Sequence, residues 1–220
     1  DALPILPFDP INDFEHVTLL MRIPFVMLVR GDSPYKTVAD LTEDLKKQGD
    51  KASYGSTANT GLVASELYKA QFGLKTVEVK YKDPQQMLNE LIAGNMAFCH
   101  CDPTSALGHM KSGKLRAIAV GSPQRVAMLP QVKTIAEQGF KGFDAVSWGG
   151  LLAPLGTPKD VVARIDKEVG EILADKSVQE KLLTAGAIAN YQSADRMAAR
   201  LKNDYDKWGR VIRDKAIGVD

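Results

Sequence analysis

Short apolar runs and longer amphipathic segments alternate along most of the chain. Apolar, β-branched residues at 16–20 and 25–29, separated by Pro24, predict two successive strand segments. A helix is predicted from Thr37, its N-cap, to about Gln48, because apolar residues there recur at the three-to-four spacing of one helix face. The apolar positions of that face are Val38, Leu41 and Leu45.

The same rhythm repeats through the middle of the chain. Strands are predicted at residues 52–54, 76–80, 96–101 and 115–120. Helices are predicted between them, ending near residues 71, 93 and 111, the second with Asp83 as cap and Pro84 at its first position. Strands that are apolar throughout and alternate with helices indicate a sheet covered on both faces. We therefore expect a doubly wound α/β lobe.

The pattern changes after Gly142. An aromatic-bearing strand is predicted at 143–153, around Trp148. Three helices are predicted after it, at about 157–174, 177–185 and 193–216, the last two with Ser177 and Ser193 at their N-caps and with no strand between them. Three consecutive helices cannot bury their apolar faces against the preceding lobe alone, so we expect them to pack on another part of the fold.

Composition narrows the class of protein. The 220 residues are 45% hydrophobic and 25% charged, typical of a globular chain of one or two domains. The net charge is +1, with 28 basic and 27 acidic residues mixed along the chain, so we expect no nucleic-acid partner. No apolar run approaches the roughly 20 residues of a membrane-spanning helix, and the first residues do not resemble a signal peptide. Secretion is therefore not established from the residues alone.

The two cysteines, Cys99 and Cys101, flank His100 in a predicted strand. A disulfide across so short a loop is strained, and residues two apart in a strand share a face, so we expect reduced, buried thiols. A metal site would need a fourth ligand and a turn in the chain, because His100 faces away from both sulfurs in a strand. We expect no metal and no cofactor.

The segment from Gly55 to Gly61 lies between a predicted strand and a predicted helix. Backbone N–H groups at a helix start, joined by short polar side chains, are typical of an anion-binding loop. The loop has neither the Gly-Lys-Ser/Thr ending of a P-loop nor a Gly-x-Gly-x-x-Gly pattern, so a carboxylate is favoured over a phosphate or a dinucleotide. The competing interpretation is that these residues only cap the helix and shape the turn.

Asp102, Pro103 and Thr104 occupy the same kind of position, after the next strand but one, where α/β sheets bind ligands. Asp102 as a helix cap before Pro103 is an equally good interpretation. We find no catalytic constellation, because His16 and His109 lie in other elements and Ser56 lacks the Gly-x-Ser-x-Gly elbow. Trp148 also has two interpretations, as a buried core aromatic or as a ligand-facing residue at a hinge.

Matching stretches spread over nearly the whole chain give it a resemblance to a known family. They lie at residues 6–10, 13–14, 17–20, 53–56, 81–82, 91–94, 112–120, 125, 129–130, 137–139, 148–154, 156–158 and 207–209. In order and spacing they resemble the substrate-binding proteins of tripartite tricarboxylate transporters, the Bug-type receptors.

The resemblance implies a fold and a division of the chain. The family has an α/β fold of the periplasmic-binding-protein type (type II-like), with two lobes joined by crossing strands. On this template residues 1–21 are a first-lobe remnant with the first crossing strand, and 22–145 form the second lobe. Residues 146–220 supply the second crossing strand and the C-terminal helices of the first lobe. Family members usually begin roughly 90 residues earlier, so we expect an incomplete first lobe, with a monomer for the full-length family and a swapped or complemented assembly as an option here.

The resemblance also implies a function and a site. We expect a periplasmic, non-enzymatic receptor that captures a small di- or aromatic carboxylate and delivers it to membrane transporter subunits. The alternative is a ligand-sensing or interaction module on the same fold with no transport role. The ligand-binding residues expected from the motifs and the resemblance together are Tyr54, Gly55, Ser56, Thr57, Ala58, Asn59, Thr60, Asp102, Pro103, Thr104 and Trp148.

Overall fold

The computed structural model describes residues 7–57 and 59–214, with the side chains of all of these except Asn59 and 211–214. The described chain forms two compact units. Unit 1 contains the residues up to Ile23 together with those from Trp148 onward, and unit 2 is Pro24–Ser147. The lobe boundaries expected from the sequence lay at 21/22 and 145/146.

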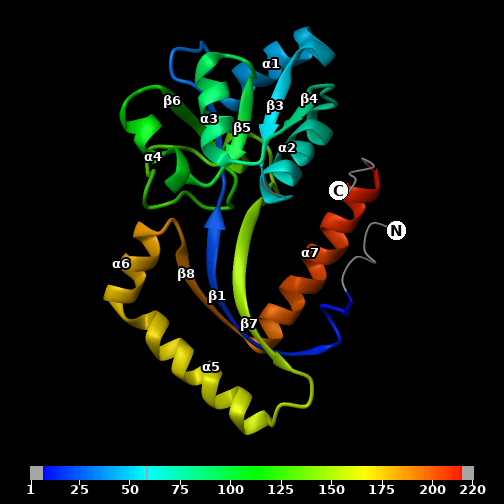
Figure 1. Ribbon diagram of the computed structural model, residues 1–220, viewed down its shortest axis with the longest axis vertical. Helices are drawn as coiled ribbons and strands as arrows, with labels where there is room; N and C mark the ends of the chain where they lie inside the picture. Colours follow the sequence, from blue (N-terminus) through cyan, green and yellow to red (C-terminus); the bar gives the residue numbers. More distant parts are fainter. Residues whose placement is uncertain (1–6, 58, 215–220) are drawn as a thin grey trace. The chain divides into compact units, whose positions relative to one another are not determined.

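Unit 2 is built on a five-stranded sheet of order β4-β3-β5-β2-β6. Its strands are β2 (Val26–Arg30), β3 (Ser53–Ser56), β4 (Val77–Lys80), β5 (Phe98–Cys101) and β6 (Leu115–Val120). Its helices are α1 (Val38–Gln48), α2 (Asn59–Phe72), α3 (Pro84–Ala93) and α4 (Pro103–Lys111). β3 runs parallel to β4 and β5, whereas β2 runs antiparallel to β5 and β6. The predicted alternation of strands and helices is confirmed (Figure 1).

The core of unit 2 follows from strands that are apolar on both faces. Residues Val26–Val29 of β2 and all four residues of β5 are buried. α1 adds the apolar face predicted from its sequence, and its Thr37 forms a capping box with Asp40. α3 begins, as predicted, with Asp83 as its cap and Pro84 at its first position, and it ends at Gly94 in the left-handed conformation, with φ 84°.

Unit 1 contains a three-stranded sheet of order β7-β1-β8. Its strands are β1 (Phe14–Pro24), β7 (Val146–Pro154) and β8 (Ile188–Ser193), and its helices are α5 (Lys159–Ala174), α6 (Lys176–Thr184) and α7 (Ala194–Asp214). Figure 1 shows β1 in blue beside β7 in yellow-green, with α5 and α6 following β7 along the chain.

The expectation of three consecutive helices without strands was wrong. Residues 188–193 form β8, which pairs antiparallel with β1, with Thr18 opposite Ser193 and Arg22 opposite Ile188. The pairing partner lies about 170 residues away in the sequence, so local periodicity did not reveal it. The expected N-cap of α6 was also wrong, because Asp175 and not Ser177 accepts the first N–H groups of that helix.

Unit 1 buries far less apolar surface than unit 2. Its buried apolar residues among those described are Val17, Leu19, Leu173, Ala187 and Met197. α5 is amphipathic, yet Val161 and Ile172 on it remain 41% and 55% exposed. The main hydrophobic core therefore belongs to unit 2. Within the described residues, none of the helices combines the length and the apolar character needed to span a bilayer.

Gly31, in the turn after β2, lies in tightly packed surroundings. A Cβ on Gly31 would lie 1.8 Å from the Gly113 carbonyl oxygen, whereas a Cβ on Gly108, inside α4, would meet nothing within 4 Å. We expect Gly31→Ala to lower the free energy of unfolding by about 2–3 kcal/mol or more, because backbone must move. Gly108→Ala is the control and should raise it by up to about 1 kcal/mol, the difference in helix propensity. Urea denaturation measures both, and equal stabilities would contradict this packing.

Candidate functional site

The predicted ligand-binding segments of unit 2 lie at one edge of its sheet. β3, β4 and β5 are parallel neighbours, with Gly55 opposite Val79 and Cys99, so their carboxyl ends meet at the same edge. Each strand is followed by a helix, α2, α3 or α4 (Figure 1). We call this end of the sheet the carboxyl edge. The loop after β3 and Asp102, which follows β5, both belong to this edge, where α/β sheets bind ligands.

The two glycines that bound the loop are required by packing. A Cβ on Gly55 would lie 2.6 Å from the Met96 sulfur and 2.8 Å from Cγ of Met87 in α3. A Cβ on Gly61 would lie 2.7 Å from the carbonyl oxygen of His100 in β5. The first turn of α2 therefore approaches β5 closely, two residues before Asp102. Glycine here sets the position of the loop.

Ser56 is buried, and its hydroxyl bonds the carboxylate of Glu78 in β4. Its carbonyl oxygen accepts the N–H of Tyr81 at 2.9 Å. A hydroxyl that donates its hydrogen to a carboxylate cannot donate it to a bound anion as well. The side chain of Ser56 thus holds β4 against the end of β3, and only other groups of the loop are free to donate.

Asp102 serves as the N-cap of α4. Its two carboxylate oxygens accept hydrogen bonds from the Thr104 hydroxyl at 2.5 Å, the Ser105 N–H at 2.9 Å and the Ser105 hydroxyl at 2.7 Å. Burial alone would raise the pKa of the Asp102 carboxyl, but these hydrogen bonds outweigh it and the pKa lies below its usual value. Pro103 occupies the first helical position without an N–H. Asp102 is therefore the cap of α4, and the Thr104 hydroxyl donates its hydrogen to the Asp102 carboxylate.

The remaining predicted residues around β3 differ in what their side chains do. Tyr54 is fully buried and donates to Glu66 of α2 at 2.6 Å, so it anchors the helix to the strand. Thr57 and Thr60 are half-buried, and their hydroxyls have no hydrogen-bond partner among the described residues. Ala58 lies outside the described residues, and of Asn59 only the backbone, at the start of α2, is described.

The three helix starts at the carboxyl edge carry different charges. α3 and α4 each begin at an aspartate, Asp83 or Asp102, which supplies a negative charge to the helix N-terminus. The residues before α2 are Ser56, Thr57 and Ala58, and none of these carries a charge. Of these three helix starts, only that of α2 has no carboxylate in the residues directly before it.

Trp148 belongs to unit 1, whereas the other predicted residues belong to unit 2. Its indole N–H donates to the buried Asp204 of α7 at 2.7 Å, and Arg200 donates to the same carboxylate oxygen at 2.7 Å. The flanking Gly150 lets α7 approach β7, since a Cβ there would lie 2.6 Å from Cε of Met197. These contacts favour the packing interpretation of Trp148, and its role in binding stays a prediction.

The cysteine prediction is confirmed. Cys99 and Cys101 are free, buried thiols, and burial raises the pKa of Cys101 to about 12 and that of Cys99 above its usual value. His100 faces the other side of the sheet, where its Nδ1 lies 2.9 Å from the Ser65 hydroxyl. Within the described part of the chain no three His, Cys, Asp or Glu side chains gather as metal ligands.

Sequence reasoning missed the buried polar network under the loop. Glu66 accepts hydrogen bonds from Tyr54 and, at 2.5 Å, from Lys69, whose ammonium also lies 5.0 Å from the centre of the Tyr54 ring. The signal in the sequence was the position of Ser65 and Glu66 between the apolar residues 62–64 and 67–68 of this helix. The Ser65 hydroxyl donates to the carbonyl oxygen of Gly61, so this network also supports the first turn of α2.

Two cavities of unit 2 are lined by described residues, and no residue predicted for the site lines either of these two. One, of about 460 Å³, lies beside β6 and is lined by Leu115, Arg116 and Leu129 among others. The other, of about 260 Å³, lies at the amino ends of β3 and β5.

Comparison with known families gives one match that spans nearly the whole chain. The model of the tripartite tricarboxylate transporter family receptor matches residues 2–217. That description is of a receptor and not of an enzyme, in agreement with the binding protein expected from the sequence. The family resemblance noted in the sequence is confirmed.

Individual relatives agree with the family match. A protein encoded in the tcbD–tcbE intergenic region of Pseudomonas sp. (strain P51) is 29% identical over 220 residues, which are 99% of this chain and 66% of the relative. The Rpa4515 protein of R. palustris, solved with adipate, is 28% identical with a TM-score of 0.81, over 96% of this chain and 71% of its own. The periplasmic binding protein BugD is 28% identical with a TM-score of 0.76, over 96% and 72%.

Two consequences follow from these similarities. The expected fold class, an α/β fold of the periplasmic-binding-protein type, is confirmed. The chain spans 66% of the length of this Pseudomonas relative, and about seven tenths of the two solved chains.

The buried imidazole of His100 predicts a pH dependence. Burial lowers the pKa of His100 to about 3 from 6.5, so the native state keeps it neutral while the unfolded chain binds a proton near pH 6.5. Its contribution to stability is complete above pH 6.5 and declines as the pH falls towards 3, by up to about 1.4 kcal/mol per pH unit. We expect His100→Gln to lose this component of the slope of unfolding free energy against pH, measured between pH 4 and 7. Parallel slopes in the two proteins would contradict the buried, neutral imidazole.

Proposed function

Because the chain belongs to the tripartite tricarboxylate transporter receptor family, we propose that the protein captures a small organic carboxylate outside the cytoplasm and delivers it to a membrane transporter. Binding and release are sufficient for this role, and no bond of the ligand changes. In this proposal the ligand binds at the carboxyl edge of unit 2, where the hydroxyls of Thr57 and Thr60 have no hydrogen-bond partner among the described residues.

The start of α2 is the observation that carries the proposal. A helix N-terminus presents backbone N–H groups and a partial positive charge, which favour an anion. At the carboxyl edge α3 and α4 satisfy this preference with Asp83 and Asp102, whereas the sequence before α2 offers only neutral residues. We propose that a carboxylate of the ligand takes the equivalent place at α2, held by backbone N–H groups of Thr57, Asn59 and Thr60.

The hydroxyls of Thr57 and Thr60 complete this half of the site. Both are half-buried and have no partner among the described residues, so each is free to donate to a carboxylate. In the proposal Ser56 and Thr104 have supporting roles, because Glu78 and Asp102 accept their hydrogens. The site is thus narrower than the sequence motifs indicated, and centres on the first turn of α2.

A dicarboxylate is the first ligand class to test. A relative 28% identical to this chain was solved with adipate. The mixture of short donors at the carboxyl edge also suits aromatic monocarboxylates, so benzoate belongs in the same panel. Delivery to transporter subunits rests on the family alone, and a transport assay with the intact system would test it separately.

We predict that Thr57→Val weakens binding of adipate, or of the panel member that binds best, by about tenfold or more, since a hydrogen bond to a charged group contributes about 1.5–3 kcal/mol. Valine keeps the shape of threonine and removes only the hydroxyl. Isothermal titration gives the affinity, and amide chemical shifts of residues 57–61 report the location. Thr184→Val, on α6 of unit 1, is the matched control. Unchanged affinity in Thr57→Val, or no shift in these amides with any carboxylate, would refute the assignment.

A further inference from the structure

A polar cavity lies at the amino edge of the sheet of unit 2, at the opposite ends of β3 and β5 from the carboxyl edge. Its volume is about 260 Å³, enough for a small ion or organic acid. Ser53, the first residue of β3, and Ala97, just before β5, mark its floor. The residues that matter for its chemistry are Arg30, Ser33, Tyr35, Lys51 and Asn95.

Ser33 is one of the residues that line this cavity, and its hydroxyl is unsatisfied. The residue is 8% exposed, and its Oγ is buried without a hydrogen-bond partner. Buried polar atoms are nearly always paired, and leaving one unpaired costs about 1–3 kcal/mol. A partner that is not part of the chain would remove this cost.

The side chain of Arg116 holds the loop that carries Ser33 through hydrogen bonds to backbone carbonyl groups. The Arg116 guanidinium donates to the carbonyl oxygens of Gly31, Ser33 and Tyr35, at 3.0 Å for Ser33 and 3.2 Å for Tyr35. The N–H of Gly31 donates to the Lys114 carbonyl oxygen at 2.8 Å. Loop 31–35 is thus fixed before any ligand arrives, and a preorganised site loses little entropy on binding.

Two cations face the same cavity. Arg30 uses its Nε to pair with Asp32 at 2.5 Å, and its Nη1 lies close over Gly94, whose added Cβ would be 2.7 Å away. The Nη hydrogens of Arg30 therefore stay near the cavity. Lys51 lines the cavity and has no ion pair with another described residue. The exposed Arg30–Asp32 pair contributes little by itself, so an anion can compete with Asp32 for the guanidinium.

The acidic groups nearby are already engaged. Asp44 accepts hydrogen bonds from the Tyr35 hydroxyl and from Gln48 at 2.5 Å. Glu90 accepts one from Asn95 at 2.5 Å. Neither carboxylate lines the cavity, whereas Arg30 and Lys51 do, so the charged side chains in its wall favour a negatively charged ligand.

We propose that this cavity is a second binding site, specific for a small oxyanion such as a carboxylate or sulfate. The bound oxyanion accepts hydrogen bonds from Ser33 and Arg30 and forms an ion pair with Lys51. It lies at the other end of the sheet from the start of α2 and needs none of the groups that the carboxyl edge uses. The proposal is therefore independent of the proposed function, and either one stands if the other fails.

Amide chemical shifts of the ¹⁵N-labelled chain test the site directly. Sodium sulfate and sodium acetate are titrated in parallel with sodium chloride at equal ionic strength. We expect saturable shifts at the amides of Asp32, Ser33, Tyr35 and Asn95 with sulfate, acetate or both. The anion that binds more tightly shows whether the site prefers an inorganic oxyanion or a carboxylate. Shifts no larger than those with chloride, or shifts that do not saturate, overturn the proposal.

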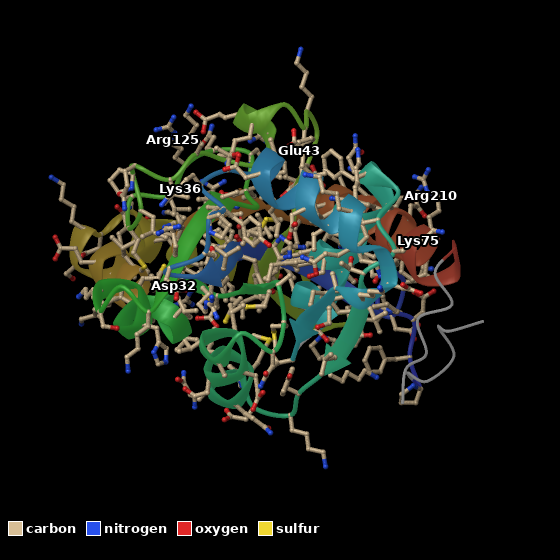
Figure 2. The ribbon with its side chains drawn as sticks, turned by 90° about the horizontal axis from the view of Figure 1, so that it is seen from above. Asp32, Lys36, Glu43, Lys75, Arg125 and Arg210 are labelled. Carbon is tan, nitrogen blue, oxygen red and sulfur yellow. The ribbon has the colours of Figure 1, made fainter. Side chains whose placement is uncertain are left out.

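Variants separate a built site from a general salt effect. Arg30→Met and Ser33→Ala should each raise the dissociation constant by about tenfold, the usual effect of losing a hydrogen bond to a charged group. Lys75→Met, which removes an exposed lysine that Figure 2 shows well away from Asp32, is the control and should bind as the parent protein does. Equal dissociation constants in all three variants would show that the shifts arise elsewhere and overturn the site.

Discussion

β3 and β5 lie side by side in parallel, with Gly55 opposite Cys99, and the helices that follow them start at the same edge of the sheet. In this arrangement α3 packs closely against β3, and the first turn of α2 packs closely against β5. Met87 of α3 occupies the space above Gly55, and the carbonyl oxygen of His100 occupies the space beside Gly61. A side chain at either glycine would push a helix away from the sheet. The position of the candidate loop is thus a consequence of core packing.

The buried polar groups beneath the loop secure the same arrangement from the other side. Tyr54 in β3 and Lys69 in α2 share the carboxylate of Glu66, and Ser65 links the His100 ring to the Gly61 carbonyl oxygen. Each hydrogen bond joins a strand to α2 or one turn of α2 to the next. A network of this kind is costly when only partly satisfied, which favours one orientation of the helix over its alternatives. The loop before α2 is therefore carried by a helix with little freedom to shift.

The parts of this structure that the sequence predicted are those controlled by local patterns. Apolar strands between amphipathic helices predicted the α/β lobe, and Asp83-Pro84 and Asp102-Pro103 marked two helix starts correctly. What the sequence did not predict depends on distant partners. β8 became a strand because β1 pairs with it, and Ser56 lost its free hydroxyl to Glu78, 22 residues away. The close contacts of Gly55 and Gly61 with Met96, Met87 and His100 also depend on distant residues, and the sequence analysis did not anticipate them.

The distribution of carboxylates at the carboxyl edge bears on which anions can bind there. Asp102, whose hydrogen bonds keep its pKa low despite burial, caps α4, and Glu78 contacts Ser56 at the end of β3, so two acidic groups belong to the carboxyl edge. A doubly charged phosphate would be repelled by both more strongly than a singly charged carboxylate group. Backbone N–H groups and neutral hydroxyls provide hydrogen bonds without adding a compensating cation. In the proposed site, such an edge would distinguish anions by charge density and favour an organic acid, whose negative charges are separated along the ligand.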